Sequence, residues 1–131
     1  MSSRIHPVTG ETLARDVRPM TARIGPFAEK VMVGGWYPAG DGDAIHTGAD
    51  LVEYEAAQRR LKARYAEYLR ASRRRWRLTQ EQAGKLIGGG KRAFQKYETG
   101  KALPTEAAVG LIELLNADEE NLERLKRIRA A

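Results

Sequence analysis

The sequence of 131 residues contains no cysteine. This absence excludes disulfide bonds and thiolate metal sites, which hold many small modules together. No apolar run approaches the roughly 20 residues that a membrane-spanning helix needs. The first residues also lack the apolar core of a secretory signal. We therefore expect a cytoplasmic protein with no membrane segment, no metal and no cofactor.

Positive charge, in contrast, is concentrated in one block. The chain has a net charge of +6, and residues 59–101 alone carry fourteen Lys and Arg against three Asp and Glu. The segments on either side are mildly acidic. Such a block is typical of a polyanion-binding surface, although an isolated charge run is more often a solvated helix face. The first interpretation is favoured because the block has few compensating acids and contains three consecutive glycines.

The N-terminal part has the pattern of a small β-rich unit. Residues 13–24 alternate apolar and polar side chains, as a half-buried strand does. Gly25 and Pro26 predict a turn, residues 29–33 a partner strand, and the Gly- and Asp-rich residues 34–50 a loop.

From Asp50 onward the pattern is helical. Residues 50–78 contain no Gly or Pro, so we expect a long helix that is N-capped by Asp50 and is either continuous or broken once near Arg64. Thr79 predicts the cap of a short helix, with Gln82 in the capping-box position. A second short helix should end at Gly100. Two further helices are expected, from Pro104 or Thr105 to Leu115 and over residues 117–131.

The glycine triplet, residues 88–90, admits two interpretations. A phosphate-binding P-loop would need glycine at position 85 and a hydroxyl residue after Lys91; the chain has Lys85 and Arg92 there, and a helix in place of the preceding strand. The alternative is the turn of a helix-turn-helix, and the sequence satisfies its requirements better.

A helix-turn-helix needs a small residue where its two helices cross and a tight turn between them. Gly84, next to Ala83, suits the crossing, and Gly88 suits the turn because it tolerates positive φ. Phe94 and Tyr97 stand three residues apart and should both face inward. Trp76, Leu86 and Ile87 are also expected in the core. The polar residues of the second helix then face outward, as on a recognition helix in the major groove.

The segment LTQEQAGKLIGGGKRAFQKYETGKALP resembles the Xre/Cro-type helix-turn-helix, and in particular the C-terminal domain of MqsA-type antitoxins. The resemblance covers about residues 67–129. It implies base contacts from Arg92, Lys96 and Gln95, because Arg pairs bidentately with guanine and Gln with adenine. Contacts to the DNA backbone are expected from four flanking residues, Thr79, Gln80, Lys91 and Lys101. Four arginines before the motif are interpreted either as long-range attraction or as a solvated face: Arg73, Arg74, Arg75 and Arg77.

The N-terminal part is similar to the zinc-binding module of the same family, but without its four cysteines. The corresponding positions fall on His6, Thr9, Pro38 and Asp41. Proline cannot ligate a metal, and an N/O site with Asp43 and His46 would lack the thiolates that structural zinc prefers. We therefore expect a degenerate zinc-ribbon-like fold without metal, in which Trp36 and Tyr37 pack in its place.

These arguments predict an α+β protein with three parts: a β-rich module over residues 1–49, a connecting helix over 50–66, and a five-helix, all-α Xre-type domain over 67–131. The predicted function is that of a repressor, either an antitoxin or a stand-alone autoregulator, which binds a palindromic operator in double-stranded DNA as a homodimer.

The dimer face is expected on the last two helices, at Leu111, Leu114, Leu115, Leu122 and Leu125. A toxin would bind the N-terminal half. No catalytic constellation is present, so we do not expect an enzyme. A protein-interaction module with an incidental basic patch, or non-specific RNA binding, remains the alternative.

Overall fold

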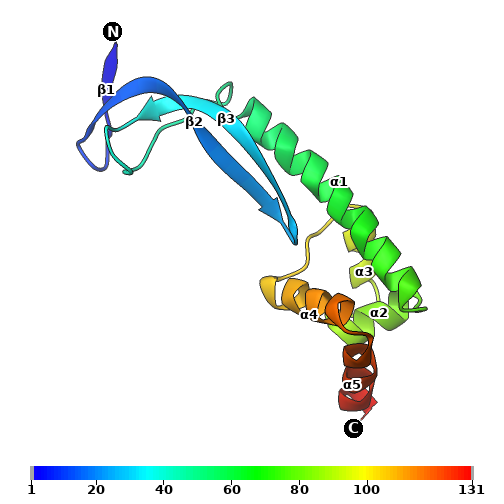
Figure 1. The fold of residues 1–131 in the computed structure, drawn as a ribbon. Helices are drawn as coiled ribbons and strands as arrows, with labels where there is room; N and C mark the ends of the chain where they lie inside the picture. Colours follow the sequence, from blue (N-terminus) through cyan, green and yellow to red (C-terminus); the bar gives the residue numbers. More distant parts are fainter. Residues whose placement is uncertain (1, 131) are drawn as a thin grey trace. The chain divides into compact units, whose positions relative to one another are not determined.

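The computed structural model describes residues 2–130, and these form three strands and five helices (Figure 1). This combination of strands and helices confirms the predicted α+β class. The chain forms two compact units, the first ending at Leu61 and the second beginning at Lys62. Helix α1 (Val52–Arg75) contributes residues to both. None of the helices in the described residues is long and apolar enough to cross a membrane.

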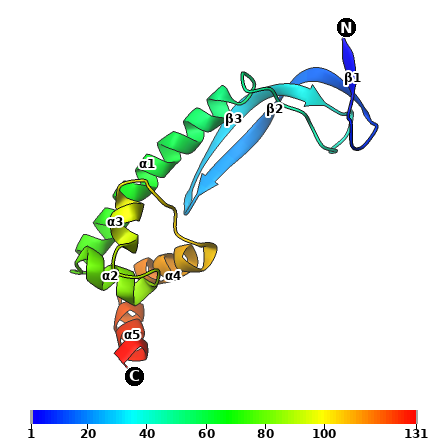
Figure 2. The ribbon, with the colours of Figure 1, turned by 180° about the vertical axis from the view of Figure 1, so that it is seen from behind.

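The first unit is built on a long antiparallel hairpin (Figure 2). Strands β1 (Ser3–Ile5), β2 (Thr12–Ile24) and β3 (Phe27–Tyr37) lie in the order β1-β2-β3. The β2–β3 pairing runs from Ala14 opposite Tyr37 to Ile24 opposite Phe27. The two predicted strands and their turn are therefore confirmed, and β2 begins one residue earlier than expected. The prediction of a loop from residue 34 was wrong at its start, because β3 continues to Tyr37. Strand β1 was not predicted, because three exposed residues carry no periodic signal.

A small apolar cluster joins this hairpin to the beginning of α1. Its buried members are Ala22, Ala57 and Leu61, and four half-buried residues pack around them: Ile24, Phe27, Val31 and Tyr54. An ion pair between Arg60 of α1 and Glu29 of β3 also links the helix to the hairpin. The first turns of α1 therefore belong to the β-rich unit as part of its core.

Helix α1 differs from the prediction at both ends. It is continuous through Arg64 and ends at Arg75, because Arg77 adopts a left-handed conformation with φ of 59°. At the other end the predicted cap was wrong, since the helix begins at Val52. The Asp50 carboxylate instead accepts a hydrogen bond from the backbone N–H of Thr47 at 2.9 Å.

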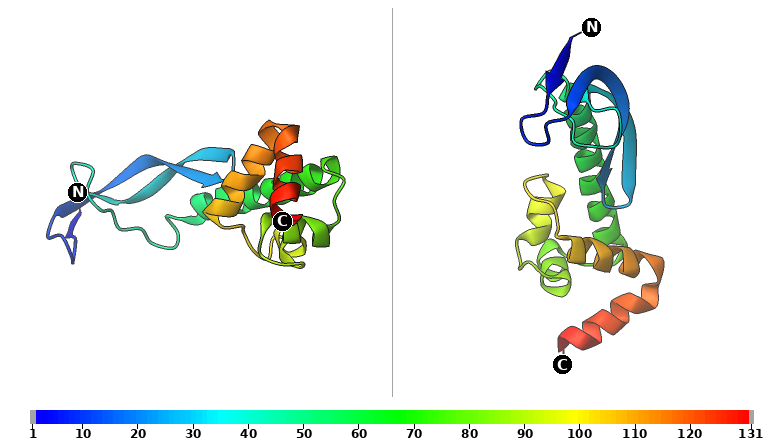
Figure 3. Two further views of the ribbon diagram at one scale, coloured as in Figure 1. Left: turned by 90° about the horizontal axis from the view of Figure 1, so that it is seen from below. Right: turned by 90° about the vertical axis from the view of Figure 1, so that its left-hand side faces the viewer.

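The second unit contains four further helices (Figure 3): α2 (Gln80–Ile87), α3 (Ala93–Glu98), α4 (Glu106–Ala117) and α5 (Glu119–Ala130). The predicted capping box of α2 is confirmed. The backbone N–H of Gln82 donates to Thr79 Oγ1 at 3.1 Å, and that of Thr79 donates to Gln82 Oε1 at 2.9 Å. Thr105 caps α4 by accepting a hydrogen bond from the N–H of Ala108.

Most of the leucines that we expected at a dimer face lie in the core of the second unit. Leu115, Leu122 and Leu125 are buried within this unit, so that part of the expectation was wrong. Leu111 is half-buried, and only Leu114 of the five is exposed, with 60% of its surface accessible. The reason is geometric: α4 and α5 are both short, and each must turn its apolar side toward the same core.

Candidate nucleic-acid interface

The glycines are explained by the close crossing of α2 and α3. A Cβ atom added to Gly84 would lie 2.1 Å from the carbonyl oxygen of Gly90, so that no larger residue fits. Gly88, Gly89 and Gly90 have φ values of 119°, 89° and 90°, in the region that disfavours side chains. The predictions for Gly84 and Gly88 are confirmed, and the other two glycines are needed for the same turn.

The inward side of α3 is apolar except at its end. Ala93, Phe94 and Glu98 are buried, and Tyr97 is half-buried. The rings of Phe94 and Tyr97 meet edge to face with their centroids 5.5 Å apart. Trp76, Leu86 and Ile87 are buried, as predicted. This contact fixes which side of α3 faces solvent.

A buried ion pair fixes the orientation of α3 further, and no motif in the sequence predicted it. The side chain of Glu98 has no exposed surface. Arg73 donates to both of its carboxylate oxygens, from Nε at 2.9 Å and from Nη2 at 3.0 Å. Arg70 contributes a longer ion pair, with its Nε 3.5 Å from Glu98 Oε1, and its Nη2 donates to the Glu98 backbone carbonyl at 3.3 Å. Arg73, which we interpreted as solvated or as an attractor of DNA, is therefore an internal anchor between α1 and α3. Its side chain is only 14% exposed.

The outward side of α3 is cationic and polar. Lys91, Arg92, Gln95 and Lys96 are all exposed. Arg92 occupies the N-cap position, but its side chain makes no capping hydrogen bond. Within residues 2–130, no hydrogen bond or ion pair engages the side chains of these four residues. The structure thus brings together on one solvent face the three predicted base-contacting residues and one predicted backbone contact.

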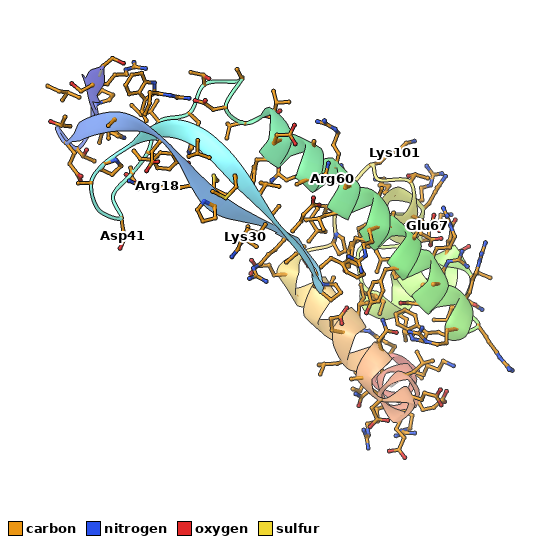
Figure 4. All side chains as sticks on the ribbon, turned by 45° about the horizontal axis from the view of Figure 1, so that its top comes forward. Arg18, Lys30, Asp41, Arg60, Glu67 and Lys101 are labelled. Atoms are coloured by element: carbon orange, nitrogen blue, oxygen red, sulfur yellow. The ribbon has the colours of Figure 1, made fainter. Side chains whose placement is uncertain are left out.

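The remaining predicted contacts flank this face. Lys101 is exposed and follows Gly100, whose φ of 76° ends α3 (labelled Lys101 in Figure 4). Thr79 is exposed at the start of α2, where its hydroxyl oxygen already accepts the capping hydrogen bond. Gln80 is half-buried. Whether these residues contact DNA stays a prediction.

The positions that correspond to zinc ligands do not converge on a metal site. The Nδ1 atom of His6 accepts hydrogen bonds from the N–H groups of Val8 and Thr9, at 3.0 and 3.3 Å. Asp41 is exposed on the loop after β3 (Figure 4), and Pro38 is buried. In the described part of the chain, no group of three or more His, Asp or Glu side chains is placed to hold a metal ion.

Polar and aromatic contacts occupy this end of the first unit. The guanidinium groups of Arg4 and Arg15 each lie 5.5 Å from the ring centroid of Trp36. Arg15 also donates to Asp50 through two hydrogen bonds of 3.0 and 2.8 Å. This pairing, together with the N–H of Thr47, holds the pKa of Asp50 well below its usual range. The sequence did not indicate the pair, because its members are far apart in the chain.

Known proteins that are similar in sequence to this chain are antitoxins. The model of the family described as "Antitoxin component of bacterial toxin-antitoxin system, MqsA" matches residues 14–126, which include α2, α3 and all the predicted contact residues. The antitoxin MqsA of Escherichia coli (strain K12) is 33% identical over 60 residues, and the alignment covers 46% of each chain. The match therefore spans about half the length of this relative. On the extent of the family match, the chain belongs to the MqsA antitoxin family.

Proposed function

We propose that the chain is a sequence-specific DNA-binding repressor of the antitoxin type, in which α2 and α3 form an Xre-type helix-turn-helix. One observation carries the proposal: α3 is anchored by Phe94 and Glu98 on one side, and the basic and amide side chains on its other side have no hydrogen-bond or ion-pair partner within residues 2–130. In this arrangement Arg92 pairs with guanine, and Gln95 and Lys96 contact neighbouring bases. A helix that is held rigidly can place such side chains against a base edge, whereas a mobile one cannot.

The flanking residues have the complementary role. Lys91 and Lys101 neutralise backbone phosphates at either end of α3. Thr79 and Gln80 hold a phosphate at the N-terminus of α2, where the unpaired N–H groups and the helix dipole favour an anion. These contacts set the register of the protein on the duplex but do not read the sequence.

We further propose that the repressor acts as a homodimer. Helix α3 has only six residues and reaches a few base pairs, so useful affinity requires a second copy on a palindromic half-site about one helical turn away. The exposed apolar side chain of Leu114, next to the half-buried Leu111, supports a dimer contact on α4. The leucines buried in the core take no part in it.

Family membership supports a toxin as the partner of the N-terminal unit, which we propose to be a metal-free form of the family's zinc module. The contacts of Trp36 with Arg4 and Arg15, and of Arg15 with Asp50, link the ends of the hairpin and the following loop as a metal would. We assign no catalytic role to either unit.

Fluorescence anisotropy with three nucleic acids tests the DNA-binding proposal: the duplex upstream of the chain's own coding region, a shuffled duplex of the same length, and a structured RNA. We expect tightest binding to the first. Arg92→Ala should lose about 1–3 kcal/mol of that preference. Lys101→Ala should weaken both duplexes alike and flatten the salt dependence. Equal binding of the two duplexes by the wild type, or preference for RNA, would favour the alternative functions.

A further inference from the structure

A second basic surface, to which α3 contributes no lining residue, is a hollow of about 590 Å³ between the end of α1, α2 and α5. Arg77, Lys85, Lys126 and Arg129 line it, and no Asp or Glu is among the lining residues. Leu78 and Leu86 are its apolar members. None of the seven residues assigned to DNA in the proposed function lines this hollow. Its charge therefore needs a separate explanation.

The conformation of Arg77 is the first sign that this surface binds something. Arg77 is the only non-glycine residue among residues 2–130 with positive φ, at 59°. It occupies the position after α1 where glycine is usual, and the N–H groups of Arg77 and Leu78 donate to the carbonyls of Arg74 and Arg73. Glycine would adopt this conformation without strain. A strained residue kept at such a place points to a role for its side chain, and within residues 2–130 the Arg77 guanidinium has no hydrogen-bond or ion-pair partner.

Arg129 is positioned from the opposite side. Its Nε donates to the carbonyl oxygen of Leu86 at 2.9 Å, which fixes the guanidinium at the C-terminal end of α2 and leaves its Nη groups for another acceptor. Among the described residues, the two lysines pair only with exposed carboxylates, Lys85 with Glu81 at 3.2 Å and Lys126 with Glu123 at 3.3 Å. Exposed pairs of this kind are weak and are readily exchanged for a stronger anion.

We propose that this hollow, with Arg77 and Arg129 as its principal donors, is a phosphate-binding site. Guanidinium groups recognise phosphate oxygens through paired N–H donors. Lysine ammonium groups add positive charge and do not require one particular hydrogen-bond geometry. Because the cations come from three elements around a hollow larger than one phosphate, the site suits a group with more than one phosphate. That group comes either from a free phosphorylated molecule or from the backbone of DNA beyond the bases that α3 reads. Only the second source rests on the proposed function.

Inorganic pyrophosphate is the probe, titrated into the full chain and followed by isothermal calorimetry and by the NMR signals of the arginine Nε–H groups. We expect saturable binding by the wild type and at least tenfold weaker binding by Arg77→Gly. This variant relieves the strained conformation, so we expect its Tm to stay at or above that of the wild type, and weaker binding without a fall in Tm is a loss of the site and not of the fold. Arg129→Gln should behave similarly. Arg127→Gln removes an exposed charge from α5 outside the hollow and is the matched control, expected to bind as the wild type does.

Binding of DNA by the same variants distinguishes the two sources of phosphate. If the phosphate belongs to DNA, Arg77→Gly weakens binding to a long duplex, and pyrophosphate competes with that duplex. If the ligand is a free molecule, Arg77→Gly binds duplexes as the wild type does. The proposal is overturned if the wild type shows no saturable binding of pyrophosphate, or if Arg127→Gln loses as much as Arg77→Gly. Neither of these outcomes bears on the base-reading role of Arg92.

Discussion

Replacing Glu98 with Gln should destabilise the second unit more than any surface change. The Glu98 side chain is fully buried and receives two hydrogen bonds of 2.9 and 3.0 Å from Arg73, which is itself only 14% exposed. Glutamine has nearly the same shape but no charge, so that Arg73 is left in the interior without a counter-ion. Breaking a buried pair in this way costs about 3–5 kcal/mol. Because a whole domain is stable by only about 5–15 kcal/mol, the loss is large.

Urea unfolding measures this loss directly. Trp76 is buried in the second unit and Trp36 lies in the first, so fluorescence in a Trp36→Phe background reports the second unit alone. The matched control is Glu120→Gln, since Glu120 also pairs with an arginine, Arg124 of α5, but is 75% exposed. That change should cost less than about 1 kcal/mol.

Two results would refute the reasoning. If Glu98→Gln costs no more than the control, the ion pair does not anchor α3. The second result concerns the double variant Arg73→Met, Glu98→Leu, which removes both charges together. This variant should recover most of the stability that Glu98→Gln loses, because apolar replacements of a buried pair are often neutral. If the double variant is no more stable than Glu98→Gln, the loss arises from packing and not from an unpaired charge.

Two other changes test the helix crossing and the N-terminal ion pair. Gly84→Ala should lower Tm, at a cost of about 1–3 kcal/mol, because its Cβ would meet the Gly90 carbonyl at 2.1 Å. Gly110→Ala, in open space on α4, should raise Tm by its helix propensity; a rise in both variants would contradict the crossing. The pKa of Asp50 is depressed by Arg15, so its contribution to stability is present above about pH 4 and is lost as the pH falls. Acid unfolding followed by Trp36 fluorescence should be less steep in Asp50→Asn, and an unchanged profile would contradict this.

Local signals in the sequence predicted much of the second unit. The capping box at Thr79 and Gln82 depends on residues three apart, and the end of α3 depends on the conformational freedom of Gly100 itself. The alternation in residues 13–24 similarly predicted β2. In each case the residues that determine the structure are neighbours in the chain, so their spacing was sufficient evidence.

The features that were missed depend on contacts between distant residues. Arg73 and Glu98 are 25 positions apart, and nothing in the composition distinguishes this arginine from its exposed neighbour Arg74. The cap predicted at Asp50 failed for the same reason, because Arg15 from β2 pairs with its carboxylate. A left-handed Arg77 also contradicts the local preference for glycine, so the end of α1 could not be placed from the pattern.

The central claim is that the outward side of α3 reads DNA bases. Its most direct test is the ratio of dissociation constants for the cognate and shuffled duplexes, measured for the wild type, Arg92→Ala and Arg23→Ala. Arg23 is exposed on β2 and is distant from α3 in the sequence. Arg23→Ala therefore removes one positive charge, as Arg92→Ala does, but not from α3. We expect the ratio to fall about tenfold or more in Arg92→Ala and to stay unchanged in Arg23→Ala. An equal ratio in all three proteins would contradict the account.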